Sequence, residues 1–242
     1  MSRFSSLVAF AAFVSACSDP ELEKRVQDLE AKVVALESRG PAAPAAAAPT
    51  GNPEQEQAAA ALLKEATQAV DQMQYAVAKE KIATLKAQYG ETRAAKASGR
   101  IEQELDIIGK PEAPLSVEKW YQGSDADAHG KATMYVFWEV WCPHCRKEVP
   151  KLEETYQKFH GSGLSLIGIT RQSKDVTDQQ VTDFVVENHL SYPIAKDQGS
   201  TMSDYYGVRG IPAAAVVRDG KVVWRGHPAK VTDEMLNGWL GR

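Results

Sequence analysis

The chain has 242 residues, a formal net charge of −4 at pH 7, and 43% hydrophobic and 25% charged residues. This length is sufficient for one or two domains with buried cores. An acidic chain without a basic cluster is not typical of nucleic-acid-binding proteins, so we expect no nucleic-acid partner. The three cysteines are Cys17, Cys142 and Cys145, and only the last two lie near each other in the sequence.

Residues 1–16 carry one positive charge, a short apolar run and then small residues. The run is too short to span a bilayer, so the segment predicts a signal peptide. Val14-Ser15-Ala16-Cys17 resembles a bacterial lipobox, which implies that Cys17 becomes an acylated N-terminus that anchors an exported protein to the membrane. Ordinary cleavage beside an unrelated cysteine is the alternative. The expected location is the bacterial periplasm, and Ser18 favours the outer membrane.

Residues 17–39 are expected to hold the lipid anchor and a short coiled coil. The heptads run through residues 21–39, with glutamate at every e position and arginine or lysine at every g position. Opposite charges at e and g favour a parallel homo-oligomer, as a dimer or a trimer. A solvated single helix is the alternative. The apolar a and d positions are Leu22, Val26, Leu29, Val33 and Leu36.

Residues 40–53 are rich in alanine and proline, which predicts an extended linker. Residues 54–110 are expected to form a small helical domain of two or three antiparallel helices, because apolar residues recur every three to four positions and Gly90 interrupts them. No catalytic constellation is evident there. The expected apolar stripes are Leu62, Ala66, Val70 and Met73, then Ala78, Ile82, Leu85 and Tyr89, then Ala94, Ala97, Ile101, Leu105 and Ile108.

Residues 111–242 alternate between expected strands and helices, and Asp219-Gly220 is a hairpin signal between two strands. This pattern predicts an α/β domain in which a mixed sheet carries helices on both faces. The expected strands are 132–138, 164–170, 192–195, 213–217 and 222–225. The expected helices are 146–160, 176–189, 201–206 and one that starts at residue 232.

Trp141-Cys142-Pro143-His144-Cys145 lies where a buried strand passes into a helix. The helix N-terminus favours a thiolate, so we expect Cys142 to be an exposed nucleophile and Cys145 to resolve the mixed disulfide. A zinc site would need two more ligands that the sequence does not offer. A structural disulfide that closes so short a loop would stabilise little.

The two residues between the cysteines support a redox role for the pair. His144 is expected to favour the Cys142 thiolate through its partial positive charge, although an idle surface histidine is the alternative. Pro143 fits the first position of a helix, where its missing N–H is not needed.

The Cys142–Cys145 motif, the strand before it and the Ile211-Pro212 step resemble the thioredoxin superfamily. Within that superfamily, residues 137–150 are most similar to the TlpA/ResA-like thiol–disulfide oxidoreductases. The resemblance spans about residues 111–242. It implies a thioredoxin-like fold, no cofactor or metal beyond the redox-active disulfide, and a cis Ile211–Pro212 bond beside the cysteines, where the neighbouring backbone pairs with substrate.

One position departs from the thioredoxin pattern. Thioredoxins carry a buried acid six residues before the first cysteine, and Val136 occupies that position here. Glu139 lies nearer to the cysteines in the sequence. It is either a replacement proton acceptor for Cys145 or a solvated charge at the end of the strand.

The sequence therefore predicts an exported, lipid-anchored, oligomeric thiol–disulfide oxidoreductase that acts on protein thiols and disulfides. We expect a reductase or isomerase kept reduced by a membrane thiol reductase. Pro143-His144 resembles the dipeptide of DsbA-type oxidants, whereas most TlpA/ResA-like proteins are reductants and Ile211 before Pro212 is the thioredoxin-like residue. We therefore expect an intermediate to oxidising potential of about −130 to −220 mV. The alternatives are a disulfide-forming oxidase and a copper-handling module, since thiolates suit Cu(I). A thiol peroxidase would instead need a lone peroxidatic cysteine.

Overall fold

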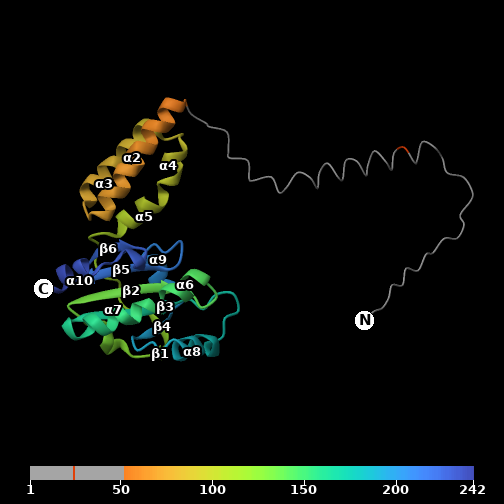
Figure 1. Cartoon of the computed structure of the whole chain (residues 1–242), viewed down its shortest axis with the longest axis vertical. Helices are drawn as coiled ribbons and strands as arrows, with labels where there is room; N and C mark the ends of the chain where they lie inside the picture. The colour runs from red at the N-terminus through yellow and green to blue at the C-terminus, as the bar shows by residue number, and fades with distance from the viewer. Residues whose placement is uncertain (1–23, 25–51) are drawn as a thin grey trace, which may run out of the picture. The chain divides into compact units, whose positions relative to one another are not determined.

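The computed structural model describes residue 24 and residues 52–242 of the chain. Residues 52–242 belong to one compact unit, whose elements are labelled in Figure 1. The predicted signal peptide, lipid anchor at Cys17, coiled coil and almost all of the linker lie outside the described residues. Within the described part of the chain, no helix combines the length and the apolar character needed to cross a membrane.

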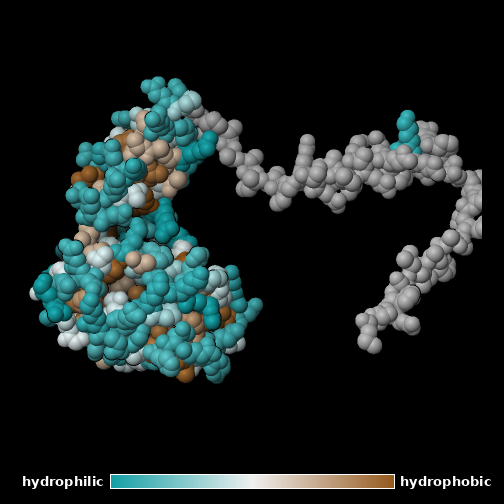
Figure 2. Space-filling view, viewed as in Figure 1, coloured by the Kyte–Doolittle hydropathy of each residue, from teal (hydrophilic) through white to brown (hydrophobic). Residues whose placement is uncertain are grey.

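The expected helical region is present, but the expected number of two or three helices is wrong. The region contains four helices: α2 (Pro53–Asp71), α3 (Tyr75–Tyr89), α4 (Arg93–Ala97) and α5 (Gly99–Ile107). The Asn52 side chain accepts a hydrogen bond from the Glu54 N–H and caps α2, and Thr92 caps α4 in the same way. The helices enclose a small apolar core around Ala66, Ile82 and Leu85. Figure 2 shows hydrophilic and apolar residues intermixed on the surface of this region.

Two of the expected apolar stripes need correction. Met73 is 40% exposed, because α2 ends at Asp71 and Met73 lies in the following turn with a φ of 56°. The third stripe does not form one helix, since α4 and α5 meet at the fully buried Ser98. Ala97 is consequently exposed, and Ile107 rather than Ile108 is buried.

The remaining residues form a six-stranded mixed sheet in the order β1-β4-β3-β2-β5-β6. Strands β2, β3 and β4 run parallel to one another, and the other pairs are antiparallel. The hairpin turn at Asp219 and Gly220 is confirmed, with φ of 51° and 68°. The strands are β1 (Val117–Gln122), β2 (Ala132–Trp138), β3 (Leu164–Thr170), β4 (Ile194–Asp197), β5 (Ala213–Arg218) and β6 (Lys221–Gly226).

Strand β1 was not predicted. It is an edge strand with two consecutive exposed charges, Glu118 and Lys119. These charges interrupt the alternation of apolar and polar residues that identifies a strand in a sequence. They also protect the sheet edge from pairing with another chain.

Helices cover both faces of the sheet, as predicted, and β2 shows why. Met134, Val136 and Trp138 point to one apolar cluster, whereas Tyr135 and Phe137 point to the other. The first cluster includes residues of α6, α7, α8 and α10, and the second includes residues of α9 and the end of α5. These helices are α6 (Pro143–Glu148), α7 (Lys151–Phe159), α8 (Asp178–Glu187), α9 (Thr201–Tyr205) and α10 (Asp233–Leu240). Short 3₁₀ turns occupy Asp125–Ala128, His160–Ser162 and Pro228–Lys230.

The expected single helix 146–160 is wrong, because it is divided into α6 and α7 around Pro150. Proline has no N–H to donate to the carbonyl four residues earlier, and its ring crowds that carbonyl. Val149 still completes α6 by donating to the Cys145 carbonyl at 2.9 Å. The short α6 therefore begins directly after Cys142, which is its N-cap residue, and holds Cys145 in its first turn.

The helical region is joined to the sheet along β6. The Gly109 N–H donates to the Val222 carbonyl at 2.8 Å, and the Tyr75 hydroxyl donates to the Val223 carbonyl at 3.2 Å. Lys230 forms an ion pair with Asp71 at 2.7 Å. These contacts place the helical region along β6, which is an edge strand of the sheet. The predicted domain boundary at residue 110 stays a prediction.

Candidate active site

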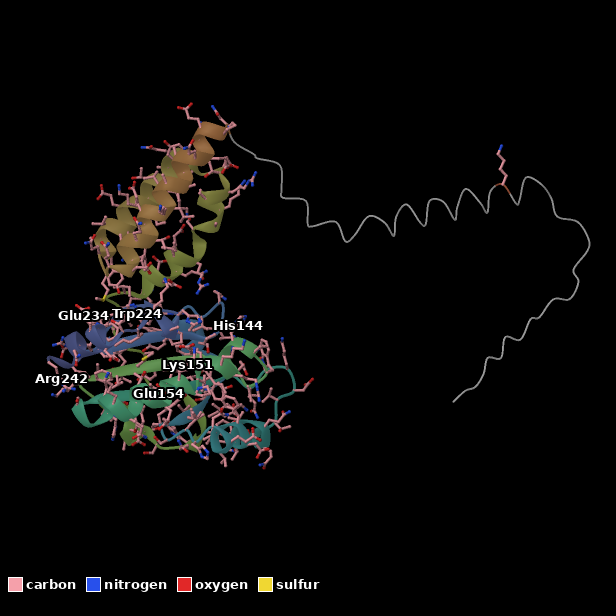
Figure 3. All side chains as sticks on the ribbon, viewed as in Figure 1. His144, Lys151, Glu154, Trp224, Glu234 and Arg242 are labelled. Carbon is pink, nitrogen blue, oxygen red and sulfur yellow. The ribbon has the colours of Figure 1, made fainter. Side chains whose placement is uncertain are left out.

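The cysteine pair lies at the end of β2, a strand paired on both sides by β3 and β5. Cys142 is the N-cap residue of α6, and Pro143 occupies its first turn. The labelled side chains in Figure 3 show His144 at the end of the sheet opposite to Glu234 and Arg242. A central, fully paired strand and a helix N-terminus therefore fix the position of the motif.

Both cysteines are free thiols and both are buried. Cys142 is 5% exposed and Cys145 is 0% exposed. The expectation of an exposed Cys142 is therefore wrong, because the loop that carries Ile211 lies against it, with 3.9 Å between the Cys142 Sγ and the Ile211 carbonyl oxygen. Cys142 is still the more accessible thiol of the pair.

Cys145 lies in surroundings that keep it protonated. The pKa of its thiol is raised to about 12, mainly by burial; a backbone hydrogen bond from Glu139 lowers it, and the nearby Cys142 and the charge of Glu139 raise it. A thiol with this pKa contains almost no thiolate at neutral pH. Its reaction as a nucleophile therefore requires a group that takes its proton.

Glu139 is buried beside this thiol, with 1% of its surface exposed. The hypothesis of a solvated end-of-strand charge is therefore wrong. Its carboxylate accepts hydrogen bonds from the Thr170 hydroxyl at 3.2 Å and from the Ser173 hydroxyl at 3.0 Å. The Ser173 N–H also donates to it, and Arg171 Nε lies 4.0 Å from Oε1. These donors compensate for the loss of water around a buried carboxylate.

The same serine connects Glu139 to the motif tryptophan. The Trp141 indole N–H donates to the Ser173 hydroxyl at 3.1 Å, and Lys174 Nζ lies 3.4 Å from the centre of the Trp141 ring. Gln172, Lys174 and Asp175 all have φ between 57° and 59°, which is unusual for residues other than glycine. The loop from residue 171 to 175 is thus held in a strained conformation around Glu139 and Trp141.

The Ile211–Pro212 peptide bond is cis, which confirms that prediction. The loop that contains it is held at both ends by Arg225, whose Nε donates to the Tyr206 carbonyl at 2.9 Å and whose Nη1 donates to the Ala214 carbonyl at 3.3 Å. Arg225 is only 5% exposed, and burial lowers the pKa of its guanidinium to about 10.

Pro143 and His144 are exposed on the first turn of α6, and the effect of His144 on Cys142 stays a prediction. Sequence reasoning missed Glu148, which lies one helical turn after Cys145, is 9% exposed and has Lys151 Nζ at 3.3 Å from its carboxylate. The spacing of three residues was the available signal, because it places two side chains on one helix face.

Sequence reasoning also missed Thr170, Ser173 and Arg225. The parallel pairing of Trp138 with Thr170 brings the ends of β2 and β3 together, so Glu139 and the residues after Thr170 meet at one edge of the sheet. Both strands were predicted from the sequence. The closeness of Glu139 and Thr170 would have followed if β2 and β3 had also been predicted to be neighbours in the sheet. No sequence pattern indicated the role of Arg225.

Across residue 24 and residues 52–242, no group of three or more His, Cys, Asp or Glu side chains is arranged to hold a metal ion. The copper-handling alternative built on Cys142, His144 and Cys145 thus has no preformed cluster to support it in the described residues. It remains a separate hypothesis that a copper titration tests.

Comparison with known proteins yields matches over the sheet-containing part of the chain. A model of the AhpC/TSA family matches residues 111–225. The thiol-disulfide oxidoreductase ResA of Bacillus thuringiensis is 36% identical over 143 residues, which are 57% of this chain and 80% of the relative. The sporulation thiol-disulfide oxidoreductase A of Bacillus subtilis is 26% identical over 110 residues, 46% of this chain and 67% of the relative.

Among solved structures, a thiol-disulfide isomerase from Corynebacterium glutamicum matches with a TM-score of 0.46 and 23% sequence identity. The match covers 54% of this chain and 94% of that chain.

Proposed function

Because the chain belongs to the thioredoxin-fold thiol–disulfide oxidoreductases that include ResA, we propose that it exchanges disulfides with exported proteins through Cys142 and Cys145. The observation that carries this proposal is the pair of free thiols at the start of α6, with the carbonyl next to the cis-proline 3.9 Å from the Cys142 sulfur. A substrate cysteine bonded to Cys142 would lie along that loop.

In the reductive direction, the Cys142 thiolate attacks a substrate disulfide, forms a mixed disulfide and releases one substrate thiolate. The Cys145 thiolate then attacks the Cys142 sulfur, which closes the Cys142–Cys145 disulfide and releases the second substrate thiolate. Two electrons pass from the protein to the substrate. A membrane thiol reductase that reverses this exchange would restore the two thiols.

Glu139 is the proton acceptor in the second step of this proposal. The proton must leave Cys145 before its sulfur can attack, and burial opposes that loss. The carboxylate of Glu139 is buried next to the thiol and is positioned by Thr170 and Ser173. A buried carboxylate with fixed orientation acts as a general base without reorganisation of solvent.

The location and direction of use are also proposals. We propose that Cys17 is lipidated, that residues 21–39 form a parallel dimer or trimer, and that the protein works at the periplasmic face of a membrane, where Ser18 favours the outer membrane. We propose a reductase or isomerase with a potential of about −130 to −220 mV. Light scattering tests the oligomer, since deletion of residues 21–39 should lower the mass of a soluble form.

Two substitutions test the activity itself. Cys142→Ser should abolish reduction of a protein disulfide, whereas Cys145→Ser should accumulate a mixed disulfide with substrate, because the resolving thiol is absent. Identical behaviour of the two variants in a trapping assay would contradict the assignment of roles. Alkylation of cells with a mass-tagged maleimide tests the direction. If the pair were mainly disulfide-bonded at steady state, an oxidase role would replace the reductive one.

A further inference from the structure

A small cavity lies beside the cis-proline loop and is bordered by three arginines from three different elements. Its volume is about 150 Å³. Arg100 comes from α5, Arg209 from the loop after α9, and Arg225 from β6. One acidic residue, Glu104 of α5, also borders it. The other lining residues are Gln103, Gly207, Gly210 and Ala213.

We propose that this cavity is an anion subsite that binds the carboxylate of an acidic residue in the substrate polypeptide. The proposal rests on the proposed function, because it concerns the substrate of the same cysteine pair. It would also give the helical region a role in catalysis, since α5 supplies one wall of the subsite.

Arg225 carries the argument, because it is a buried cation whose hydrogen-bond partners are neutral. Its Nε and Nη1 donate to the carbonyls of Tyr206, Ala214 and Gly226, and the side chain is 5% exposed. No carboxylate accepts a hydrogen bond from it among the described residues. Burying a charge is unfavourable unless an opposite charge compensates it, so this guanidinium favours the arrival of an anion.

The charges around Arg225 leave the cavity positive. Arg100 Nε lies 3.2 Å from the Glu104 carboxylate, so that acid is already paired. Arg209 is exposed and has no ion-pair partner in the part of the chain that the structure describes. Three guanidinium groups against one carboxylate leave an excess of two positive charges. Guanidinium groups bind carboxylates through paired hydrogen bonds, which makes arginine the residue suited to this ligand.

The position of the cavity selects a polypeptide side chain as its occupant. Gly210 and Ala213 border the cavity and flank Ile211 and Pro212, and the Ile211 carbonyl oxygen is 3.9 Å from the Cys142 sulfur. A substrate strand bound along this loop advances about 3.3 Å per residue, so residues near its reacting cysteine can reach the cavity. A liquid water occupies about 30 Å³, so the space equals roughly five waters and accommodates an acidic side chain.

The test uses a series of nine-residue peptides with a central cysteine, bound as a mixed disulfide to 5-thio-2-nitrobenzoate. One glutamate is moved through the other positions, and each peptide is paired with its glutamine counterpart. Cys142 of the reduced full-length protein attacks the peptide sulfur and releases the coloured thiolate, and Cys145 then releases the peptide thiol. Each protein reacts once, and the rate of absorbance change under excess peptide gives the second-order rate constant of this exchange. We expect the wild-type protein to prefer glutamate over glutamine about tenfold at one position or two adjacent ones, since a charge-assisted hydrogen bond is strong.

Three variants identify the cavity as the source of this preference. In the double variant Arg100→Gln/Arg209→Gln, the glutamate-to-glutamine ratio should fall to about one or two. In Glu104→Gln the ratio should rise severalfold, because the competing carboxylate is gone and Arg100 is free. A purely structural role of these residues predicts no such rise. Arg218→Gln is the matched control, since it removes a positive charge from β5 outside the cavity and should leave the ratio unchanged.

The outcomes separate the subsite from the proposed function. Reaction of both peptides with the wild-type protein at equal rates, at every position, overturns the subsite and leaves the oxidoreductase function intact. A preference that persists in the double variant assigns the selectivity to another surface and also overturns the subsite. Failure to release the thiolate from any peptide contradicts the proposed function itself.

Discussion

Two buried charged side chains belong to the surroundings of the cysteine pair: Glu139 lies beside Cys145, and Arg225 holds the loop that covers Cys142. Their hydrogen-bond partners differ. Glu139 is 1% exposed and accepts hydrogen bonds from two hydroxyls and one backbone N–H. Arg225 is 5% exposed and donates only to backbone carbonyls. Glu139 also has Arg171 at 4.0 Å, whereas no carboxylate binds Arg225 among the described residues.

The difference shows what each charge does. Glu139 lies against the Cys145 thiol and has donors that orient its carboxylate, an arrangement suited to proton transfer. Arg225 connects the two ends of the cis-proline loop, an arrangement suited to fixing backbone geometry. Burial alone therefore does not show what a charged side chain near a reactive centre does. Its hydrogen-bond partners indicate whether it transfers a proton or holds the backbone.

The largest effect is expected from removing the positive charge. Arg225→Met should lower the free energy of unfolding by about 3 kcal/mol, because it leaves buried carbonyls without donors and frees both ends of the loop. Urea denaturation followed by tryptophan fluorescence measures this change. Arg218→Met, at a partly exposed position on β5, is the control and should change the stability by less than about 1 kcal/mol.

Neutralising the negative charge should affect catalysis rather than stability. Glu139→Gln preserves the size of the side chain but removes the proton acceptor, so resolution of the mixed disulfide by Cys145 should slow about 100-fold. Rapid-quench kinetics separates this step from the attack by Cys142, which should change much less. Glu118→Gln, on the edge strand β1, is the control. Equal slowing of both steps would contradict the assignment of Glu139 to Cys145.

The pH dependence sharpens the same point. Burial is the largest cause of the raised pKa of Cys145 and persists in Glu139→Gln, so the thiolate fraction of the variant should rise about tenfold per pH unit from pH 7 to 10, and the rate of resolution with it. The wild-type protein should show a flatter profile, since Glu139 takes the proton. Stopped-flow measurement of the second step over this range checks both slopes.

Removing one support of Glu139 should have a smaller effect. Ser173→Ala deletes the hydroxyl that links Glu139 to Trp141, and we expect resolution to slow about fivefold, equal to about 1 kcal/mol for one hydrogen bond. Ser173→Thr retains the hydroxyl and should recover most of the rate. If Thr failed to restore it while the fold remained intact, the packing of the loop rather than the hydrogen bond would be responsible.

The smallest effect should come from an exposed charge pair that joins the end of α2 to the 3₁₀ turn at residues 228–230. Asp71→Asn breaks the ion pair with Lys230. Both side chains of this pair are about half exposed, so the free energy of unfolding should fall by no more than about 0.5 kcal/mol. Thermal unfolding with and without 0.5 M salt measures this. A larger loss would mean that the junction between the helical region and the sheet depends on this pair.

Much of the architecture followed from local patterns in the sequence. Strands β2 and β3 have the predicted bounds, since continuous apolar runs indicate buried central strands. The redox role of Cys142 and Cys145 was predicted from their spacing at a strand-to-helix turn, and the cis Ile211–Pro212 bond from the resemblance to a known family. The break at Pro150 and the charged edge strand β1 were missed, although both had sequence signals in proline chemistry and charge placement.

The chain by itself determined which residues carry the thiols and which strands form the centre of the sheet. Only the tertiary structure decided that Cys142 is covered, that Glu139 is buried beside Cys145, and that Arg225 holds the cis-proline loop. These facts depend on residues separated by tens of positions, which meet only when parallel strands align and loops pack. Periodicity along a chain reports which face of an element is apolar, but it does not report which charged side chains from distant elements lie together.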